Sequence, residues 1–264
     1  MTTATRSDAP AAIILAAGKG TRMKSDLPKV CHPIGGRAMV CAVVDACREA
    51  GCGKIVVVVG YKQELVREAL AGYSGLAFAL QEEQLGTGHA VLCAQGFFEG
   101  VGQGGSGGTG EAREVFVLCG DGPLIRASTL RKVLDRHRAT GASATLATSV
   151  IADPTGYGRV VRDETGKFVG IVEQKNATPA QLLIREVNPS YYCFEPGALF
   201  SALSRVERNQ ATGEYYVTDV PTLLMADGRR VEVIDAVPPE DVLSINTLEH
   251  LAEVDRIYRS RGGA

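Results

Sequence analysis

The sequence has no excess of one charge and no long apolar run. It contains 28 Lys plus Arg and 30 Asp plus Glu in 264 residues, a balance that argues against a nucleic-acid partner, which usually goes with a basic excess. The longest apolar run, residues 11–17, is much too short to span a membrane. Residues 1–10 are polar and lack the apolar centre of a signal peptide. We therefore expect a flexible N-terminus, no membrane partner and a cytoplasmic protein.

The sequence also lacks paired cysteines. Its 7 cysteines are odd in number and none has CxxC spacing, which argues against a disulfide framework and against a zinc site. Most lie in apolar or helical contexts, where a free thiol behaves as a small hydrophobic side chain. Cys31 and His32 are adjacent, but neighbouring residues rarely face each other, so we do not expect a catalytic pair.

Strand and helix patterns alternate in the first half of the chain. The short apolar runs typical of buried strands are residues 11–17, 54–60, 77–81, 115–119 and 144–151. The intervening segments with helical spacing are residues 40–51, 64–70, 89–98 and 130–137. Alternating strands and helices predict a parallel sheet with right-handed crossovers.

The pattern changes after residue 151. Residues 159–162 and 168–173 flank the turn sequence Asp163–Lys167, which predicts a hairpin. Further strands are expected at 185–194 and 230–236, and further helices at 197–206, 216–226 and 248–259. We predict one α/β domain over residues 1–264, with a Rossmann-like, mostly parallel sheet flanked by helices and a small β-hairpin region. The Gly-rich segment 100–110 is expected to be a flexible surface insertion.

The strongest local motif is the Gly-rich, basic stretch Leu15–Met23, which follows the first predicted strand. Glycines at the carboxyl end of a parallel strand let backbone N–H groups approach phosphate oxygens, and Lys19 and Arg22 add positive charge. The stretch is not a dinucleotide fingerprint, because Met23 stands where the third Gly belongs, and no window matches a Walker A loop. On its own it is either a phosphate-binding loop or an ordinary Gly-rich turn.

The longer run LAAGKGTRMKSDLPKV resembles the signature of the sugar-phosphate nucleotidyltransferases. It is most similar to the amino-terminal uridylyltransferase domain of the bacterial bifunctional N-acetylglucosamine-1-phosphate uridylyltransferase/glucosamine-1-phosphate acetyltransferase. Similar blocks follow in the family's order, at residues 84–90, 120–121, 153–159 and 213–219. The resemblance implies the nucleotide-diphospho-sugar transferase fold. It also implies Mg²⁺-dependent uridylyl transfer from UTP to N-acetylglucosamine-1-phosphate, with release of pyrophosphate.

The resemblance also assigns roles to the charged residues. Arg22 and Lys29 would be catalytic and hold phosphate oxygens, while Asp121 and Asn246 would bind Mg²⁺, whose preferred ligands are oxygen atoms. Without the resemblance, Asp121 would be a turn former and Asn246 a helix cap. Because the phosphate nucleophile is already ionised, no general base is needed, and we expect His89 to be part of the hydrogen-bonding scaffold.

The nucleotide site implied by the resemblance comprises Leu15, Ala16, Ala17, Gly18, Lys29, Gln81, Gly86, Thr87, Cys119, Gly120 and Asp121. Within it, the Gln81 amide offers a donor and an acceptor to the uracil edge. Gly86 allows close backbone approach, and Gly86–Thr87 would contact the base. Cys119 stands where close relatives often have Tyr, and Gly122 replaces an apolar residue.

The sugar site implied by the resemblance comprises Gly158, Glu173 and Asn188. Asn188 is followed by Pro189-Ser190 instead of the family's small pair, and Pro fixes φ and removes a donor. This departure leaves glucose-1-phosphate or another hexose-1-phosphate open as the sugar substrate. The alternative from another functional class is a regulatory protein that binds a nucleotide sugar but catalyses no reaction.

The family's acetyltransferase β-helix has no counterpart in the pattern of this sequence. We find no hexapeptide periodicity, so neither acetyl transfer nor the trimer that the β-helix forms is expected here. The sequence leaves the oligomeric state open.

Overall fold

The computed structural model describes residues 8–98 and 112–262. The predicted insertion at 100–110 and most of the predicted flexible N-terminus lie outside the described residues. Among the described residues, no helix is both long enough and apolar enough to cross a membrane.

The central feature is a nine-stranded sheet in which the strand order along the main path is β11-β7-β10-β6-β1-β4-β5. The parallel neighbours are β1–β4, β1–β6, β4–β5 and β7–β11, whereas β10 is antiparallel to β6 and β7. The strands of this path are β1 (Ala11–Ala16), β4 (Lys54–Val59), β5 (Leu76–Leu80), β6 (Val115–Cys119), β7 (Ala144–Val150), β10 (Glu186–Phe194) and β11 (Val231–Asp235). This arrangement confirms the predicted α/β class with a mostly parallel sheet.

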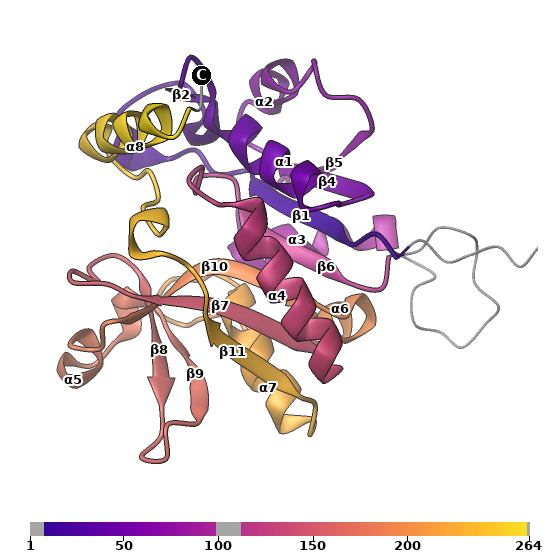
Figure 1. The fold of residues 1–264 in the computed structure, drawn as a ribbon, viewed down its shortest axis with the longest axis vertical. Helices are drawn as coiled ribbons and strands as arrows, with labels where there is room; N and C mark the ends of the chain where they lie inside the picture. Colours follow the sequence, from indigo (N-terminus) through magenta and orange to yellow (C-terminus); the bar gives the residue numbers. More distant parts are fainter. Residues whose placement is uncertain (1–7, 99–111, 263–264) are drawn as a thin grey trace, which may run out of the picture.

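Helices cover both faces of the sheet (Figure 1). One face packs against α1 (Met39–Glu49), α2 (Gln63–Ala69), α4 (Ala127–Thr140) and α8 (Leu248–Ser260). The other face packs against α3 (Thr87–Leu92), α6 (Pro196–Leu203) and α7 (Val220–Ala226). Burial on both faces explains why β4 is a run of valines: Val56 to Val59 are each 0% exposed.

The predicted hairpin is present as β8 (Gly158–Arg162) and β9 (Phe168–Val172), and β8 also pairs with β10. The Asp163 carboxylate accepts hydrogen bonds from the backbone N–H groups of Thr165 and Lys167, at 2.9 and 3.0 Å. The hairpin projects beyond β7 and β10 (Figure 1). A short helix, α5 (Pro179–Leu182), lies between β9 and β10.

Two predicted helices differ in extent. The helix expected at 89–98 is α3, which starts earlier, at Thr87, and ends at Leu92; a separate 3-10 turn follows at Gln95–Phe98, with Gly96 inside it. The helix expected at 216–226 begins as the 3-10 turn Val217–Asp219 and becomes α7 only at Val220. Pro221 lies in the first turn of α7, where its missing N–H costs nothing.

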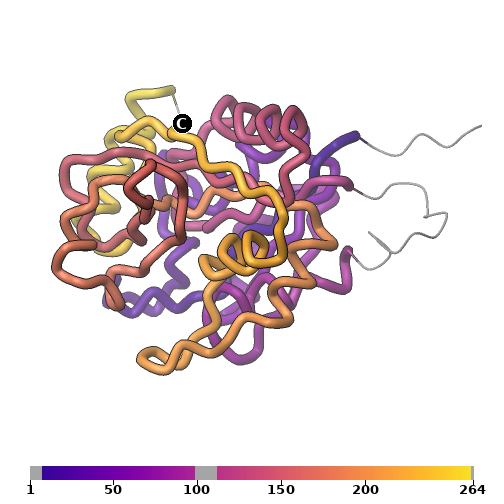
Figure 2. Tube along the Cα trace, turned by 90° about the horizontal axis from the view of Figure 1, so that it is seen from below, coloured from indigo at the N-terminus to yellow at the C-terminus, as the bar shows by residue number. Residues whose placement is uncertain are grey.

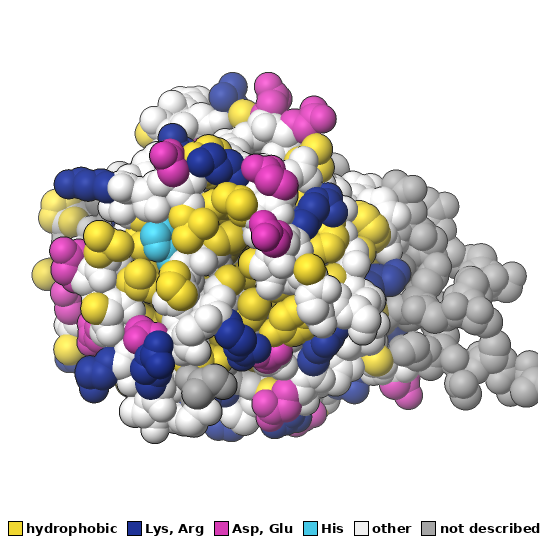
Figure 3. Space-filling view, turned by 90° about the horizontal axis from the view of Figure 1, so that it is seen from above, with side chains coloured by type: hydrophobic (Ala, Val, Ile, Leu, Met, Phe, Trp, Pro, Cys, Tyr) yellow, Lys and Arg dark blue, Asp and Glu magenta, His cyan; other side chains and the backbone are white. Residues whose placement is uncertain are grey.

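The last part of the chain returns to the first (Figures 1 and 2). The helix α8 lies beside the small ribbon of β2 (Pro33–Ile34) and β3 (Arg37–Ala38), and the Asp255 carboxylate accepts from Gly35 N at 2.7 Å. Seen from the α8 and β2 end, apolar side chains gather in the middle of the surface, with charges of both signs around them (Figure 3). The return brings the segment before α8 next to the carboxyl ends of β1 and β6.

Candidate active site

Two cavities lie next to each other at the carboxyl ends of β1 and β6. The first, of about 320 Å³, has predicted nucleotide-site residues in its lining, and the second, of about 220 Å³, has predicted sugar-site residues. Both cavities are lined by Lys29, Cys119 and Asp121. We call them the nucleotide cavity and the sugar cavity. Their shared wall is where a nucleotide phosphate and a sugar phosphate would meet.

Lys29 is the centre of this shared wall. Its ammonium forms an ion pair with the Asp121 carboxylate and donates to Asn246 Oδ1 at 2.7 Å. The Arg22 guanidinium donates to the same Asn246 oxygen, also at 2.7 Å. The four charged or metal-binding residues that the sequence predicted therefore converge, although Asn246 lies far along the chain from the others.

Backbone contacts hold these side chains in place. Gly20 has φ +72°, and a Cβ there would lie 2.6 Å from Lys29 Cβ, so only glycine allows the loop to fold onto Lys29. Gly120 N donates to Leu15 O at 2.9 Å, and Ile245 N donates to Asp121 O at 3.1 Å. These bonds link β6 to β1 and the segment before α8 to the Asp121 loop.

Asn246 is not the helix cap that its sequence position suggests in isolation. The residue that caps α8 is Thr247, whose hydroxyl accepts from His250 N at 3.2 Å. The Asn246 amide instead donates from Nδ2 to Ser244 Oγ at 3.1 Å and directs Oδ1 toward Lys29 and Arg22.

The oxygen atoms around Lys29 would suit a hard divalent cation. Asp121 and Asn246 direct a carboxylate oxygen and an amide oxygen to the same ammonium, and both are hard ligands that Mg²⁺ prefers. The described residues contain no group of three or more His, Cys, Asp or Glu that could hold a metal. A site with one carboxylate and one amide suits an ion that takes its other ligands from phosphate and water.

In the nucleotide cavity, Gln81 is buried beside the loop Gln84–Gly88. Its Nε2 lies 3.1 Å from both Gly86 O and His89 Nδ1. The loop is tied to the residue that follows β1 by Gln84, whose amide donates to Ala17 O at 2.9 Å. Gly86 has φ +102°, and a Cβ there would lie 2.5 Å from Tyr215 O, so the loop requires glycine at this position.

In the sugar cavity, Glu173 is the acidic side chain that the predicted sugar site offers. Its carboxylate accepts from Thr218 Oγ1 at 3.2 Å and would lie 3.7 Å from a Cβ at Gly158. Burial raises the pKa of Glu173, and the hydrogen bond from Thr218 lowers it by less. Glu173 is partly buried in the cavity wall, unlike a solvated strand residue.

Asn188 lines the sugar cavity, and both ends of its side-chain amide already have one hydrogen-bond partner. Nδ2 donates to the Tyr192 hydroxyl at 2.6 Å, and Oδ1 accepts from Ser190 N at 3.2 Å. The register of β10 against β7 shifts between Val187 and Tyr191, and Ser190 has φ +65°. The departure at Asn188-Pro189-Ser190 is therefore a bulge that turns the Asn188 amide toward its own strand.

The cysteines of the structure are free thiols, as the sequence predicted. Burial, with a smaller effect of the Asp121 charge, raises the pKa of Cys119 to about 12. Burial likewise raises the pKa of Cys31 to about 11, with a smaller effect of Cys41. Thiols with such pKa values stay protonated at neutral pH and are poor nucleophiles, which supports the expectation that Cys31 and His32 form no catalytic pair.

Some predicted residues lie outside the cavities. Ala16 is buried and lines neither cavity, and Gly120, which also lines neither, donates from its backbone N to Leu15 O of the nucleotide cavity. Lys19 lies with its ammonium 5.2 Å from the ring centroid of Tyr61 and lines neither cavity. The other predicted site residues line one cavity or both.

Sequence reasoning missed the supports of the sugar cavity. Tyr157 donates from its hydroxyl to Val242 O at 3.2 Å and accepts from Ser244 N at 3.3 Å, which ties this cavity to the segment of Asn246. Arg159 is 1% exposed and donates to Tyr157 O and to Gln174 Oε1. The block at residues 153–159 contained both residues, but an isolated Tyr or Arg carries no signal of such a role.

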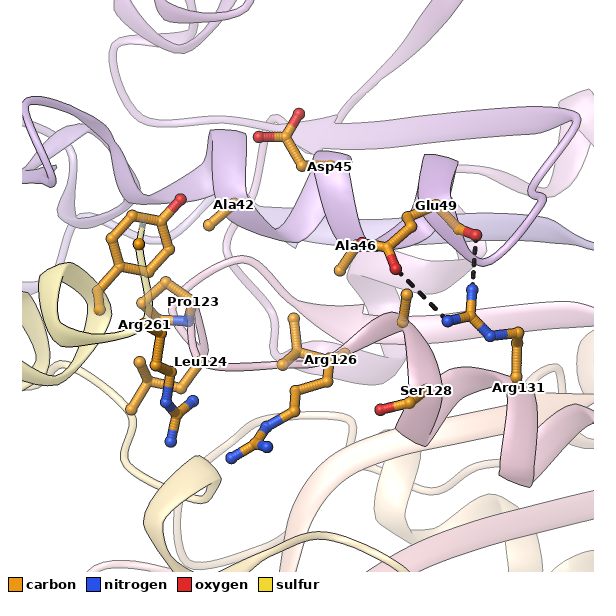
Figure 4. A pocket seen from close by; sticks show the side chains of 14 residues that line it. Ala42, Asp45, Ala46, Glu49, Pro123, Leu124, Arg126, Ser128, Arg131 and Arg261 are labelled. Atoms are coloured by element: carbon orange, nitrogen blue, oxygen red, sulfur yellow. Dashed lines mark hydrogen bonds and ion pairs between the residues drawn. The ribbon is translucent and has the colours of Figure 1, made fainter. Parts of the chain in front are cut away.

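A larger cavity, of about 490 Å³, lies between α1, α4 and the end of α8 (Figure 4). Its arginines are paired with acidic groups: Arg131 with Glu49, and both Arg126 and Arg261 with Asp241. This cavity contains no predicted site residue. Because its charges neutralise each other, it is a poorer candidate for binding polyanions than the pair of smaller cavities.

Comparison with known proteins finds relatives over most of the chain. Residues 12–212 match the family of MobA-like NTP transferase domains. The chain is 48% identical over 251 residues to "Bifunctional protein GlmU" of Geobacter metallireducens, covering 95% of this chain and 51% of that relative. It is 42% identical to the protein of the same name in Desulfotalea psychrophila, covering 95% of this chain and 71% of that relative. The chain thus spans about half the length of the first of these relatives.

Among solved structures, a UDP-glucose pyrophosphorylase complexed with UDP-glucose superimposes with a TM-score of 0.73. The match covers 96% of this chain and 99% of the other, at 17% sequence identity. At this identity the similarity shows a shared fold, and it confirms the predicted nucleotidyltransferase architecture.

Proposed function

The chain belongs to the family of MobA-like NTP transferase domains, and on that premise we propose that it transfers the uridylyl group of UTP to N-acetylglucosamine-1-phosphate. In this reaction an oxygen of the sugar phosphate attacks the α-phosphorus of UTP. The bond from the α-phosphorus to the bridging oxygen breaks, and pyrophosphate leaves. The proposal rests on one observation: the two cavities share the wall of Lys29, Cys119 and Asp121, where the two phosphates must meet.

The chain's own residues would act by positioning and charge neutralisation. Lys29 and Arg22 would neutralise the phosphate oxygens at the shared wall, where two polyanions otherwise repel each other. The loop at Gly18 would offer backbone N–H groups to the triphosphate. No side chain needs to remove a proton, because the attacking phosphate oxygen is already ionised.

Asp121 and Asn246 would hold Mg²⁺, which would supply charge stabilisation at the α-phosphate when bound. Their present partner, the Lys29 ammonium, marks the point at which their oxygens converge. We propose further that the reaction takes place in the cytoplasm, as the sequence predicts.

At the two ends of the site, polar side chains would select the ligands. Gln81 and the loop of Gly86 and Thr87 would contact uracil, and Glu173 would accept hydrogen bonds from sugar hydroxyls next to Gly158. A carboxylate accepts hydrogen bonds strongly, and Glu173 retains an accepting oxygen beside its bond from Thr218.

The state of Asn188 favours a second candidate substrate. Its amide nitrogen already donates one hydrogen to the Tyr192 hydroxyl and its oxygen accepts from Ser190 N, so a single Nδ2–H is left to contact an N-acetyl group. A hexose-1-phosphate without that group, such as glucose-1-phosphate, is therefore the alternative acceptor.

Pyrophosphate release, measured for each of the four common NTPs with each sugar phosphate, tests the proposal. We expect turnover with UTP and N-acetylglucosamine-1-phosphate that requires added Mg²⁺. A preference of about tenfold or more for glucose-1-phosphate, roughly 1.4 kcal/mol in transition-state binding, would establish the alternative acceptor. Binding of UTP without any turnover would show a nucleotide-binding regulatory protein and would overturn the proposed enzymatic activity.

A further inference from the structure

We propose that His89 is a positioning residue: it fixes the Gln81 amide so that its oxygen faces the nucleotide cavity, which selects a nucleobase that presents an N–H group. The inference rests on the proposed function and deepens it, because it explains a choice of uracil over cytosine. The two residues lie on different elements, Gln81 just after β5 and His89 in α3.

The orientation of the Gln81 amide follows from its first partner. A backbone carbonyl can only accept a hydrogen bond, so the amide atom 3.1 Å from Gly86 O must be the nitrogen. The side chain has little freedom otherwise, since Gln81 is 4% exposed and its backbone N donates to Val59 O at 2.8 Å.

The second amide hydrogen determines the state of the histidine. Gln81 Nε2 lies 3.1 Å from His89 Nδ1, and an amide nitrogen can only donate, so Nδ1 must be the unprotonated acceptor. The ring proton then sits on Nε2, 4.0 Å from Cys93 Sγ, a weak acceptor. The ring is held in place because α3 is anchored by the bond from Gly88 N to Tyr215 O, at 2.8 Å.

Both hydrogens of the Gln81 amide are used by these two bonds, so only the amide oxygen is left for a nucleobase. Gln81 Oε1 has no hydrogen-bond partner among the described residues, and Gln81 lines the nucleotide cavity. A ring N–H, such as N3–H of uracil, satisfies this oxygen. At the same position cytosine has an N3 lone pair and no hydrogen. Gln81 Oε1 and cytosine N3 would then be two acceptors that face each other without a hydrogen bond.

The role of His89 is therefore to accept a hydrogen bond from the second N–H of Gln81, which could otherwise turn toward the base. Without an acceptor at Nδ1, this N–H group is unpaired and buried, and the amide gains by turning about its remaining bond to Gly86 O until this hydrogen points into the cavity. The amide can then donate to cytosine as well as accept from uracil, so discrimination falls.

The test compares His89→Leu, which removes the acceptor, with His89→Asn, which places an amide oxygen near the position of Nδ1. Steady-state kcat/KM is measured for UTP and CTP, with KM for the sugar phosphate as a third readout. His250→Leu, at an exposed histidine of α8, is the matched control. We expect the UTP/CTP ratio to fall by about tenfold or more in His89→Leu, to recover in His89→Asn and to stay unchanged in His250→Leu.

Two further measurements keep the test decisive. In a Gln81→Leu background, His89→Leu should change the UTP/CTP ratio no further, because the two residues act as a unit. The binding of UTP and CTP, measured by calorimetry, gives the same ratio even if the protein has no turnover, so failure of the proposed function stays distinguishable. A folded His89→Leu protein with an unchanged ratio, or one in which KM for the sugar phosphate rises instead, would overturn the inference.

Discussion

The nucleotide cavity and the sugar cavity share a wall, yet they are built differently. The nucleotide cavity lies at the ends of parallel strands, and its shape depends on backbone: Gly20 folds onto Lys29, and Gly86 folds onto Tyr215. The sugar cavity lies beside the antiparallel strand β10 and depends on side chains such as Glu173 and Asn188. Added volume should therefore damage the first cavity, whereas changes of polar groups should damage the second.

The interior behind the sugar cavity shows the difference most clearly. Arg159 is buried and donates to a carbonyl oxygen and to Gln174 Oε1, which also accepts from Gly156 N at 3.0 Å. Its Nε has no partner among the described residues. Burial lowers the pKa of Arg159, and the charge of Asp153 raises it by less. Polar groups that are costly to bury thus support the sugar side, whereas the nucleotide side is supported by β1 and β4.

The largest expected effect is at the wall that both cavities share. Asp121→Ala should lower kcat by at least about a thousandfold, because it removes the one carboxylate proposed for Mg²⁺ and the ion-pair partner of Lys29. Pyrophosphate release measures the effect, and circular dichroism verifies the fold. Asp26→Ala, at a carboxylate that is 94% exposed, is the control and should retain activity. A fully active Asp121→Ala enzyme would show that the metal assignment is wrong.

Gly86→Ala should separate the two cavities. The added Cβ would meet Tyr215 O at 2.5 Å in a left-handed conformation, so we expect KM for UTP to rise at least about tenfold while KM for the sugar phosphate changes little. Gly96→Ala is the matched control, because a Cβ there meets nothing within 4 Å and its φ is not positive. Equal changes in both KM values would contradict the separation.

Glu173→Gln should change KM for the sugar phosphate, whereas Gly86→Ala should change KM for UTP. Replacing a charged acceptor by a neutral one should raise KM for the sugar phosphate by about ten- to a hundredfold and leave KM for UTP nearly unchanged. The exposed Glu207→Gln is the control. A rise confined to KM for UTP would show that Glu173 contributes to nucleotide binding and not to sugar binding.

The same variant should be more stable than the wild type at neutral pH. Burial raises the pKa of Glu173 above its ordinary value of 4.5, so its contribution to stability is complete below that value and is lost as the pH rises through the raised pKa. Glu173→Gln removes this loss, so its unfolding temperature should exceed that of the wild type at about pH 7.5, and the difference should vanish at about pH 4. A difference independent of pH would exclude titration of Glu173 as its cause.

The smallest effect is expected in the bulge of β10. Ser190 has φ +65°, which glycine adopts without strain, so Ser190→Gly should raise the free energy of unfolding by up to about 1 kcal/mol. Ser201→Gly, inside α6, should instead lower it by about 0.5–1 kcal/mol. Urea unfolding measures both. A loss of stability in Ser190→Gly would show that the Ser190 side chain matters more than the backbone strain.

The two cavities also differ in how well the sequence predicts them. The buried runs at β1, β4 and β6 and the glycine-rich loop after β1 carry local patterns, so most of the residues that line the nucleotide cavity are among those that the sequence predicts. The resemblance predicts that Asp121 and Asn246 lie together, whereas the local pattern alone would suggest that Asn246 is a helix cap, because an Asn before a helix is typical of a cap.

The sugar side was less predictable because its contacts are non-local. The hairpin was expected from Asp163–Lys167, but no local signal indicates that Tyr157 bonds to Val242, which lies 85 positions further along the chain. The delayed start of α7 has the same origin. Gly88 N donates to Tyr215 O at 2.8 Å and Val217 N donates to Thr87 Oγ1 at 3.1 Å, so residues 215–217 bond to the first turn of α3 instead of forming regular helix.

The most direct test of the account is a crystal structure with UDP-N-acetylglucosamine bound. We predict that uracil contacts Gln81 Oε1 and Gly86, that the diphosphate lies at Lys29 and Asp121, and that the sugar lies between Gly158 and Glu173. Uracil in the sugar cavity, or the ligand in the cavity between α1, α4 and α8, would contradict the assignment of the two cavities.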